Sequence, residues 1–408
     1  MKKATLTAIG LALICAGNAN AGGYQLNEFS TTGLGRAFSG AGIMDDDYSN
    51  LANNPAGMVL AKRSGMQLGY TAVEEYSHVK GTQPGESTRM HYPVSLPSAF
   101  GQWRVNDRAT LGAGFYVPFG LSTKHKSSSF VGNTARKSEL QVMDTAIAGA
   151  YRVTDKLSLG ATGIYRYIHG NMTSDVGAGA TKLGSANYDL DGWTMTGIIG
   201  AMYEFTPDTR LGISYKMKSK QTVKGDYRFE AAHPVAGGPY IFDDGRASPD
   251  LPASLIISAY HQLNDKWGLS ASARWTQWSV FDTFTMYTPT GSSAPGGFQQ
   301  HQYDWRDTIT YSIGADYKIN DNWTWRFGGA YDPSPCKSAR HRTNRIPDVN
   351  RIWAATGFSY ESGNWQLDGG FAHLFMTKGW VHKGYNDVTE AQYASKSNMY
   401  SLNLQYKF

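Results

Sequence analysis

The chain has 408 residues and a formal net charge of +5, with charges of both signs spread along its length. This mixture excludes the concentrated basic surface of a nucleic-acid-binding protein. Beyond the first residues no apolar run reaches about 18 residues, which excludes a bundle of membrane-spanning helices. The clearest bias is toward glycine and aromatic residues, with 46 Gly, 25 Tyr, 17 Phe and 11 Trp.

Residues 1–21 predict a signal peptide. Two lysines precede an apolar stretch (residues 6–16) and a cleavage pattern of small residues (19–21). We therefore expect the mature chain to begin at Gly22 and to be exported.

From about residue 66 onward, polar and apolar residues alternate with period two, which is typical of strands with two different faces. In residues 157–167 the apolar face carries Leu157, Leu159, Ala161, Gly163, Tyr165 and Tyr167. The opposite face carries Ser158, Gly160, Thr162, Ile164 and Arg166. Residues 308–319 repeat the pattern, and aromatic residues gather toward the ends of such faces.

Turn residues divide this region into long strands. Six tight turns are predicted at 106–107, 154–155, 206–208, 264–265, 320–321 and 362–363. Seven longer polar connections are predicted near 80–91, 125–137, 172–187, 231–251, 288–302, 333–349 and 383–397. An even strand count, with tight turns at one end and long loops at the other, is typical of bacterial outer-membrane barrels. We predict an all-β fold in which residues 65–408 form a 14-stranded antiparallel transmembrane barrel.

The last ten residues alternate in the same way and end on Phe408. Such a strand suits barrel closure and recognition by the barrel-insertion machinery. We therefore place the protein in the outer membrane of a Gram-negative bacterium, as a monomer in contact with outer-membrane lipid and lipopolysaccharide.

Residues 22–64 are too irregular for strands and too rich in small polar residues for a core helix. A barrel of fourteen strands is too wide for its own side chains to fill, so we predict that this segment folds into the lumen as a plug, where irregular backbone is buried in protein. Its apolar residues include Phe29, Leu34 and Phe38. The alternative is a disordered periplasmic tail, against which the spaced apolar residues and the rigid Asn54-Pro55-Ala56 argue.

Several strings in the chain resemble the FadL family of outer-membrane transporters for long-chain fatty acids and other hydrophobic molecules. They are GYQLNEFSTTGLGRAFSGAG (23–42), NNPAGM (53–58), YVPFGLSTKH (116–125), QWSVF (277–281), DNWTWRFGGAYDPSP (321–335) and RIPDVNRIW (345–353). The resemblance covers nearly the whole mature chain.

The resemblance implies a mechanism. A hydrophobic ligand is caught among the outer loops, passes to an interior pocket closed by the plug, and leaves sideways through an opening made by a kink in the third strand. The family's NPA element corresponds to Asn54, Pro55 and Ala56, and the kink to Pro118, Phe119 and Gly120. Physical chemistry agrees with the kink, because proline cannot donate to a β-ladder and glycine weakens a strand. A simple bend near the rim is the alternative.

A buried ligand carboxylate would need cationic partners. Arg166 and Arg274 are expected on the lumen face and are our candidates, as is Arg326 by its register. The alternative is that these arginines pair with lumen carboxylates such as Asp316 or with the plug. Residues 298–305 have glutamines where the family suggests a lysine, and the connection between the fifth and sixth strands is short. Two alternative functions therefore remain: uptake of neutral aromatic hydrocarbons, and a surface receptor or adhesin whose lumen is closed.

Enzymatic motifs are absent from the sequence: there is no Gly-x-Ser-x-Gly and no His-Glu-x-x-His, although an outer-membrane phospholipase could hide a Ser/His pair. We predict no enzyme, no cofactor and no metal. The run Asp45-Asp46-Asp47 could bind calcium, but an acidic turn of the plug explains it better.

Overall fold

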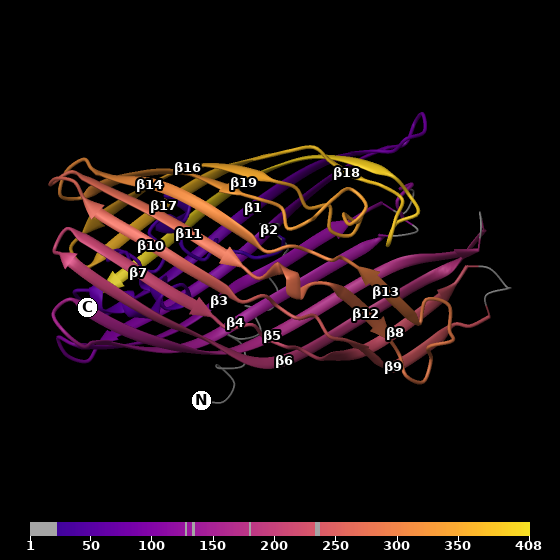
Figure 1. Ribbon diagram of the computed structural model, residues 1–408, viewed down its shortest axis with the longest axis horizontal. Helices are drawn as coiled ribbons and strands as arrows, with labels where there is room; N and C mark the ends of the chain where they lie inside the picture. Colours follow the sequence, from indigo (N-terminus) through magenta and orange to yellow (C-terminus); the bar gives the residue numbers. More distant parts are fainter. Residues whose placement is uncertain (1–22, 127–128, 133–134, 179–180, 233–236) are drawn as a thin grey trace.

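The computed structural model describes residues 23–126, 129–132, 135–178, 181–232 and 237–408, and the predicted signal peptide lies outside the described residues. Within these ranges the strands form one antiparallel sheet that closes on itself, because β1 (Gly65–Lys80) pairs with both β2 (Ser87–Arg104) and β19 (Ala391–Lys407). Figure 1 shows the resulting elongated barrel. Between β2 and β19 the sheet contains β3 (Ala109–Lys124), β4 (Lys137–Arg152), β5 (Leu157–Ala178), β6 (Thr181–Thr206), β7 (Thr209–Lys216), β8 (Val223–Ala231), β9 (Tyr240–Ala247), β10 (Ser254–Gln262), β11 (Trp267–Thr276), β12 (Thr283–Tyr287), β13 (Phe298–Gln302), β14 (Thr308–Lys318), β15 (Trp323–Asp332), β16 (Arg351–Ser362), β17 (Trp365–Met376) and β18 (Gly379–Val381).

Five strands of the wall are interrupted and run as two consecutive segments. The pairs are β7 with β8, β9 with β10, β11 with β12, β13 with β14, and β17 with β18. A short 3-10 helix, η4 (Trp278–Val280), marks one interruption. The barrel therefore has fourteen strands, which confirms the predicted count.

The predicted alternation of faces is also confirmed. Leu159 and Tyr165 on β5 are 46% and 48% exposed, whereas their neighbours Ser158 and Arg166 are buried. Exposed aromatic rings stack between adjacent strands on the outside, for example Tyr165 with Trp193 at a centroid distance of 4.7 Å. The outer face is thus apolar and the inner face polar, as lipid outside and protein inside require.

All six tight turns lie between the predicted strand pairs, at the end of the barrel that also holds the C-terminus (Figure 1). Five of the seven predicted long connections were wrong in extent. The range 172–187 is mostly strand, since β5 and β6 continue into it. The ranges 231–251 and 288–302 contain β9 and β13, and β2 and β19 begin within 80–91 and 383–397. Beyond the apolar band β6 carries polar residues outward, such as Lys182 and Asp189, and apolar residues inward, such as Tyr188 and Leu190, so the alternation that identified lipid-facing strands is reversed there.

The N-terminal segment, as we call residues 23–61, holds the helix α2 (Thr31–Gly35) and the 3-10 helices η1 (Tyr48–Ala52) and η2 (Pro55–Leu60). It packs against the inner face of the wall on opposite sides: α2 contacts β15, β16, β17 and β19, while η2 contacts β3 to β7. Leu34, Leu51 and Ala56 have no exposed surface.

Among the residues that the structure describes, no helix is long and apolar enough to cross a membrane.

Candidate functional site

An apolar pocket lies inside the barrel, above the N-terminal segment. Its empty space is about 640 Å³, part of it open to solvent. Its lining is formed by Tyr24, Leu121, Ser138, Glu139, Leu140, Ile168, Gly170, Met172, Tyr188, Leu190, Val223, Ala247, Pro249, Phe281, Phe284, Met286, Tyr303 and Ile346. Nearly all these side chains are apolar or aromatic, so the pocket favours a hydrophobic ligand.

One wall of the pocket comes from the N-terminal segment. The ring of Tyr24 is 1% exposed and lies 4.8 Å from the ring of Trp278 and 5.5 Å from that of Phe281, measured between centroids. Trp278 is the first residue of η4 and Phe281 is its C-cap, just after the end of β11. The interruption of this strand therefore turns two large rings inward. Movement of Tyr24 would therefore change the shape of the pocket.

The wall next to the pocket has a gap between β2 and β3. Ladder pairs between these strands run only from Arg104–Thr110 to Ala99–Phe115, and the described residues form no further pair between them. Beyond that point β3 also shifts its register against β4, between Tyr116 and Phe119. The irregularity thus contains Pro118, which cannot donate a ladder hydrogen bond.

The free edge of β3 is taken by the N-terminal segment. Leu26 N–H donates to the carbonyl of Pro118 at 2.8 Å, and Gly120 N–H donates to the carbonyl of Tyr24 at 2.9 Å. Gln25 and Phe119 face each other between these two bonds. A single β-bridge made by residues 24–26 therefore takes the place of β2 as the neighbour of β3 at this point.

The gap is bordered by apolar side chains. Leu26, Val94, Leu96, Val117 and Met143 belong to one buried cluster, contributed by the N-terminal segment, β2, β3 and β4. The side chain of Phe119 is 1% exposed and belongs to the cluster around the pocket. Residues 24–26 therefore lie between two apolar clusters, one around the pocket and one beside the gap.

The residues predicted to form the plug are all held against the wall or within the segment. Asn54 caps η2 by accepting from Ala56 N–H at 3.1 Å and donates from Nδ2 to the carbonyl of Ala201 on β6 at 3.1 Å. Pro55 is the first residue of η2, a position that suits its missing N–H. Phe29 packs at a tilt against Tyr116, Phe38 packs edge-on against Trp353, and Leu34 is fully buried.

Wall glycines let the segment approach closely. A Cβ at Gly160 of β5 would stand 2.5 Å from the backbone nitrogen of Ala56, and one at Gly328 of β15 would stand 2.3 Å from the carbonyl oxygen of Arg36. Any side chain at these positions would push the backbone of the segment away from the wall.

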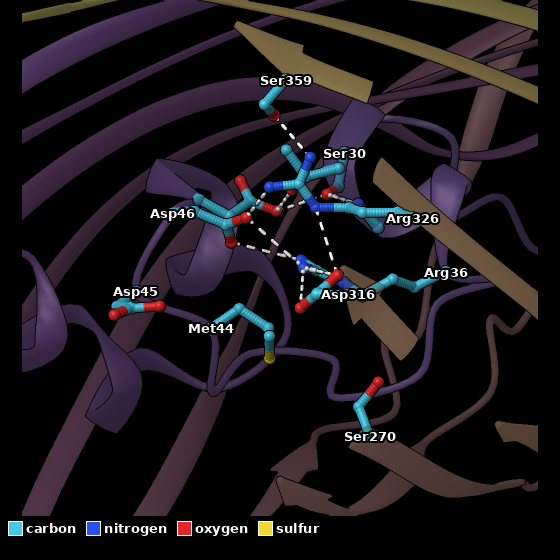
Figure 2. Close-up of polar contacts among 12 residues, drawn as sticks. Ser30, Arg36, Met44, Asp45, Asp46, Ser270, Asp316, Arg326 and Ser359 are labelled. Carbon is cyan, nitrogen blue, oxygen red and sulfur yellow. Dashed lines mark hydrogen bonds and ion pairs between the residues drawn. The ribbon is translucent and has the colours of Figure 1, made fainter. Parts of the chain in front are cut away.

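An ion network fixes the other side of the segment (Figure 2). Arg36 lies between Asp46 of the same segment, at 3.2 Å, and Asp316 of β14, at 3.0 Å. Arg326 of β15 contacts the same two carboxylates and donates to Ser359. Burial alone would raise the pKa of the Asp46 carboxyl, but Arg36 and Arg326 beside it bring the pKa below its usual value.

The arginines predicted to bind a ligand carboxylate already form contacts with other groups of the protein. Arg166 forms a bidentate ion pair with Asp144 of β4, at 2.6 and 2.7 Å, and lies over the ring of Phe119. Arg274 donates to Asn27 and, at 3.1 Å, to Asn53 of the N-terminal segment. It lines a second, more polar cavity between this segment and β10–β16, together with Phe38, Asp332 and Trp353. The alternative expectation from the sequence is that the lumen arginines pair with carboxylates of the wall or with the N-terminal segment. Arg166, Arg274 and Arg326 all do so.

Sequence reasoning missed the other side of the gap and most of the pocket. Pro93 and Pro97 lie in β2, and prolines are tolerated in strands that have an unpaired edge, so they were an available signal. Phe281 and Ile346, which line the pocket, and Trp278, which packs against Tyr24, belong to strings that resembled the family but had received no role.

Within the described ranges, no group of three or more His, Cys, Asp and Glu residues could hold a metal ion. Asp45, Asp46 and Asp47 point to different partners: Arg210, the two network arginines, and the N–H of Ser49, respectively.

Taken together, a closed fourteen-stranded barrel with a buried N-terminal segment and an apolar lumen pocket defines an outer-membrane transport protein. A family model described as "Outer membrane protein transport protein (OMPP1/FadL/TodX)" matches residues 12–408. The chain belongs to this family. It is therefore a transport protein of the Gram-negative outer membrane rather than an enzyme.

Relatives and solved structures agree. The chain is 31% identical to a "47 kDa outer membrane protein" of Pasteurella multocida, over 99% of this chain and 98% of the relative. It is 27% identical to the "Long-chain fatty acid transport protein" of Escherichia coli K12, with 98% and 97% covered. A crystal structure of a Pseudomonas aeruginosa FadL homologue superposes with a TM-score of 0.86 at 23% identity, covering 95% of this chain and all of the other. The Pseudomonas putida toluene transporter TodX superposes at 0.78 and 19%, with 95% and 99% covered, so these two structures support the fold.

Proposed function

We propose that this protein takes up hydrophobic molecules passively, with long-chain fatty acids as the leading class. The ligand is caught by the connections on the far side from the tight turns, is held in the apolar pocket, and leaves sideways through the gap between β2 and β3. The observation that carries the proposal is that residues 24–26 form a wall of the pocket through Tyr24 and also close the free edge of β3.

A lateral exit suits such a ligand physically. Each Å² of apolar surface that enters water costs about 25 cal/mol, so direct release into the aqueous periplasm is unfavourable. A route through the gap delivers the molecule to the hydrocarbon layer along apolar side chains. We propose that residues 22–64 act as the plug, with Phe29, Leu34, Phe38, Asn54, Pro55 and Ala56 holding it in place and Pro118, Phe119 and Gly120 forming the lateral opening.

The fatty-acid assignment is supported by the relatives of about 27% identity that bear the name long-chain fatty acid transport protein. Neutral aromatic hydrocarbons are the second candidate. They are favoured by the pocket lining, which includes no basic side chain, and by the toluene transporters that share the fold.

We further propose that the barrel acts as a monomer embedded in outer-membrane lipid and lipopolysaccharide. The insertion machinery would recognise β19 and the terminal Phe408. Light scattering in detergent tests the monomer, and deletion of Phe408 tests insertion.

Sealing the gap tests the route. In the double variant Phe119→Ile, Gly120→Val, β-branched residues favour a regular strand that pairs with β2. We expect cellular uptake of radiolabelled oleate to fall to background while the purified protein still binds oleate. Gly149→Val on the neighbouring β4 is the control, since a Cβ there meets only one side-chain atom, at 3.8 Å. Wild-type uptake by the sealed variant would exclude the lateral route.

A further inference from the structure

Arg345 is a buried cation that no other part of the site uses. It lies in the connection between β15 and β16 and is 2% exposed. Its Nη1 donates to Ser138 Oγ at 3.1 Å and to the carbonyl of Lys137 at 3.3 Å, and its Nη2 donates to Ser174 Oγ. Its Nε–H is buried without a partner among the described atoms.

The charge of Arg345 lacks a carboxylate of its own. Arg345 forms no salt bridge with any carboxylate of the described chain, in contrast to Arg36, Arg166, Arg326 and Arg351. Asp387 acts on it from a distance while accepting from Asn344 N–H at 3.1 Å and from Asn344 Nδ2 at 2.8 Å. Glu139, at the edge of the pocket, is paired with Lys137 at 2.6 Å.

Burying the charge of Arg345 without a paired carboxylate costs free energy, and a bound anion would reduce this cost. A buried charge normally needs a hydrogen-bonded counter-ion, and hydroxyl and carbonyl oxygens compensate it only in part. Burial lowers the pKa of the Arg345 guanidinium, yet arginine stays protonated in proteins. The guanidinium of Arg345 therefore favours the binding of a negatively charged group.

The position of Arg345 connects this affinity with the apolar pocket. Ser138, which accepts from Arg345, lines the pocket, and so does Ile346, the next residue in the chain. Tyr303 lines it as well and acts electrostatically on Arg345. One hydrogen bond, to Ser138, therefore connects the guanidinium with the edge of a pocket that is otherwise apolar.

We propose that Arg345, with the hydroxyl of Ser138, receives the acidic head group of an otherwise hydrophobic ligand and makes the pocket prefer carboxylates over neutral molecules. This inference rests on the proposed function, since it presumes that the pocket binds the transported molecule. It assigns the head group to Arg345 in place of Arg166, which is paired with Asp144, and of Arg274, which lines the other cavity.

The magnitude follows from hydrogen bonding to a charged group. Hydrogen bonds to charged groups contribute enough to change affinity by about ten- to hundredfold. A neutral alcohol of equal chain length gains only an ordinary hydrogen bond there. The pocket should therefore bind a carboxylate at least about tenfold more tightly than the corresponding alcohol.

The experiment compares two ligands that differ only in the head group. Oleate and oleyl alcohol are titrated into the purified full-length protein in a non-ionic detergent at pH 8, followed by native mass spectrometry. The variants are Arg345→Met, which removes the charge and keeps an apolar chain of similar length, and Arg345→Lys, which keeps the charge. Arg340→Met is the matched control, because Arg340 lies in the same connection and is exposed.

We expect the wild type, Arg340→Met and, more weakly, Arg345→Lys to prefer oleate, and Arg345→Met to bind both ligands equally with unchanged affinity for the alcohol. Equal binding of the two ligands by the wild type overturns the inference without any variant, so a variant that fails to fold does not decide the matter. A preference for oleate that survives in Arg345→Met, or an equal loss of both ligands in that variant, also overturns it. If the wild type binds neither ligand, the proposed function itself fails.

Discussion

Arg36 in the N-terminal segment donates from Nη1 to both carboxylate oxygens of Asp316 on β14, each at 3.0 Å. The two residues are 280 positions apart in the sequence. Their contact joins the segment to the wall at β14, several strands away from the contact of Asn54 with β6. Because Asp46 and Arg326 complete the network with two positive and two negative charges, its net charge is zero. The segment is therefore held by a balanced buried network rather than by a single contact.

Removing Arg36 should loosen the plug. Arg36→Met leaves two carboxylates facing one arginine, and loss of one partner from a buried pair typically costs about 3–5 kcal/mol. We expect the purified variant to show increased ion conductance in planar bilayers while the barrel remains intact by heat-dependent gel mobility. Arg228→Met is the control, since it removes an exposed salt bridge to Asp226 that contributes about 0–1 kcal/mol. Wild-type conductance of Arg36→Met would mean that the network does not hold the plug.

Locking residue 25 to β3 should stop transport reversibly. Gln25 and Phe119 face each other as a pair flanked by two backbone hydrogen bonds. Such non-hydrogen-bonded antiparallel pairs have Cα atoms about 4.5 Å apart, within the range of disulfides. In a Cys336→Ser background, we expect oxidised Gln25→Cys, Phe119→Cys to lose at least about nine-tenths of oleate uptake and to regain it with a reductant. Gln25→Cys alone is the control. Unimpaired uptake by the cross-linked protein would show that residues 24–26 need not move.

The N-terminal segment should open more readily as the pH rises. Burial raises the pKa of the Glu28 carboxyl from 4.5 to about 7, so the folded segment binds a proton that the unfolded chain releases. This stabilisation is present in full below pH 4.5 and is lost as the pH rises through 7, amounting to about 3 kcal/mol at most. We expect hydrogen exchange of residues 23–36, corrected for intrinsic rates, to show weaker protection at pH 8 than at pH 5.5. Glu28→Gln should abolish the difference, and a difference that persists in this variant would assign it to another group.

The barrel could be predicted from sequence because its pattern is local. Alternation over 157–167 assigns Leu159 to lipid and Arg166 to the lumen whatever the neighbouring strands are, and the turn residues set the strand count. The partner of a lumen residue cannot be predicted from the local pattern. Asp144 and Arg166 belong to adjacent strands, yet only the register between β4 and β5 sets them opposite each other.

The site was predictable only in part for the same reason. Pro118 and Gly120 indicate that β3 is irregular, but nothing local indicates that Tyr24 and Leu26 complete its ladder. Arg345 gave no signal at all, since its isolation from carboxylates depends on the packing of the connection against β4 and β5.

A side chain at Gly160 should displace the Asn54-Pro55-Ala56 turn. In the variant Gly160→Val the new Cβ would lie 2.5 Å from the backbone nitrogen of Ala56 and from the carbonyl carbon of Pro55, distances that no rotamer relieves. We expect proteolysis of residues 50–60 at least about tenfold faster than in the wild type, together with higher ion conductance. Gly163→Val is the matched control on the same strand, because its Cβ faces outward and meets only Ile147, at 3.9 Å. If both variants behave like the wild type, the close approach of η2 to the wall does not contribute to closing the lumen; if both leak, the cause is the strand β5 itself rather than its contact with the plug.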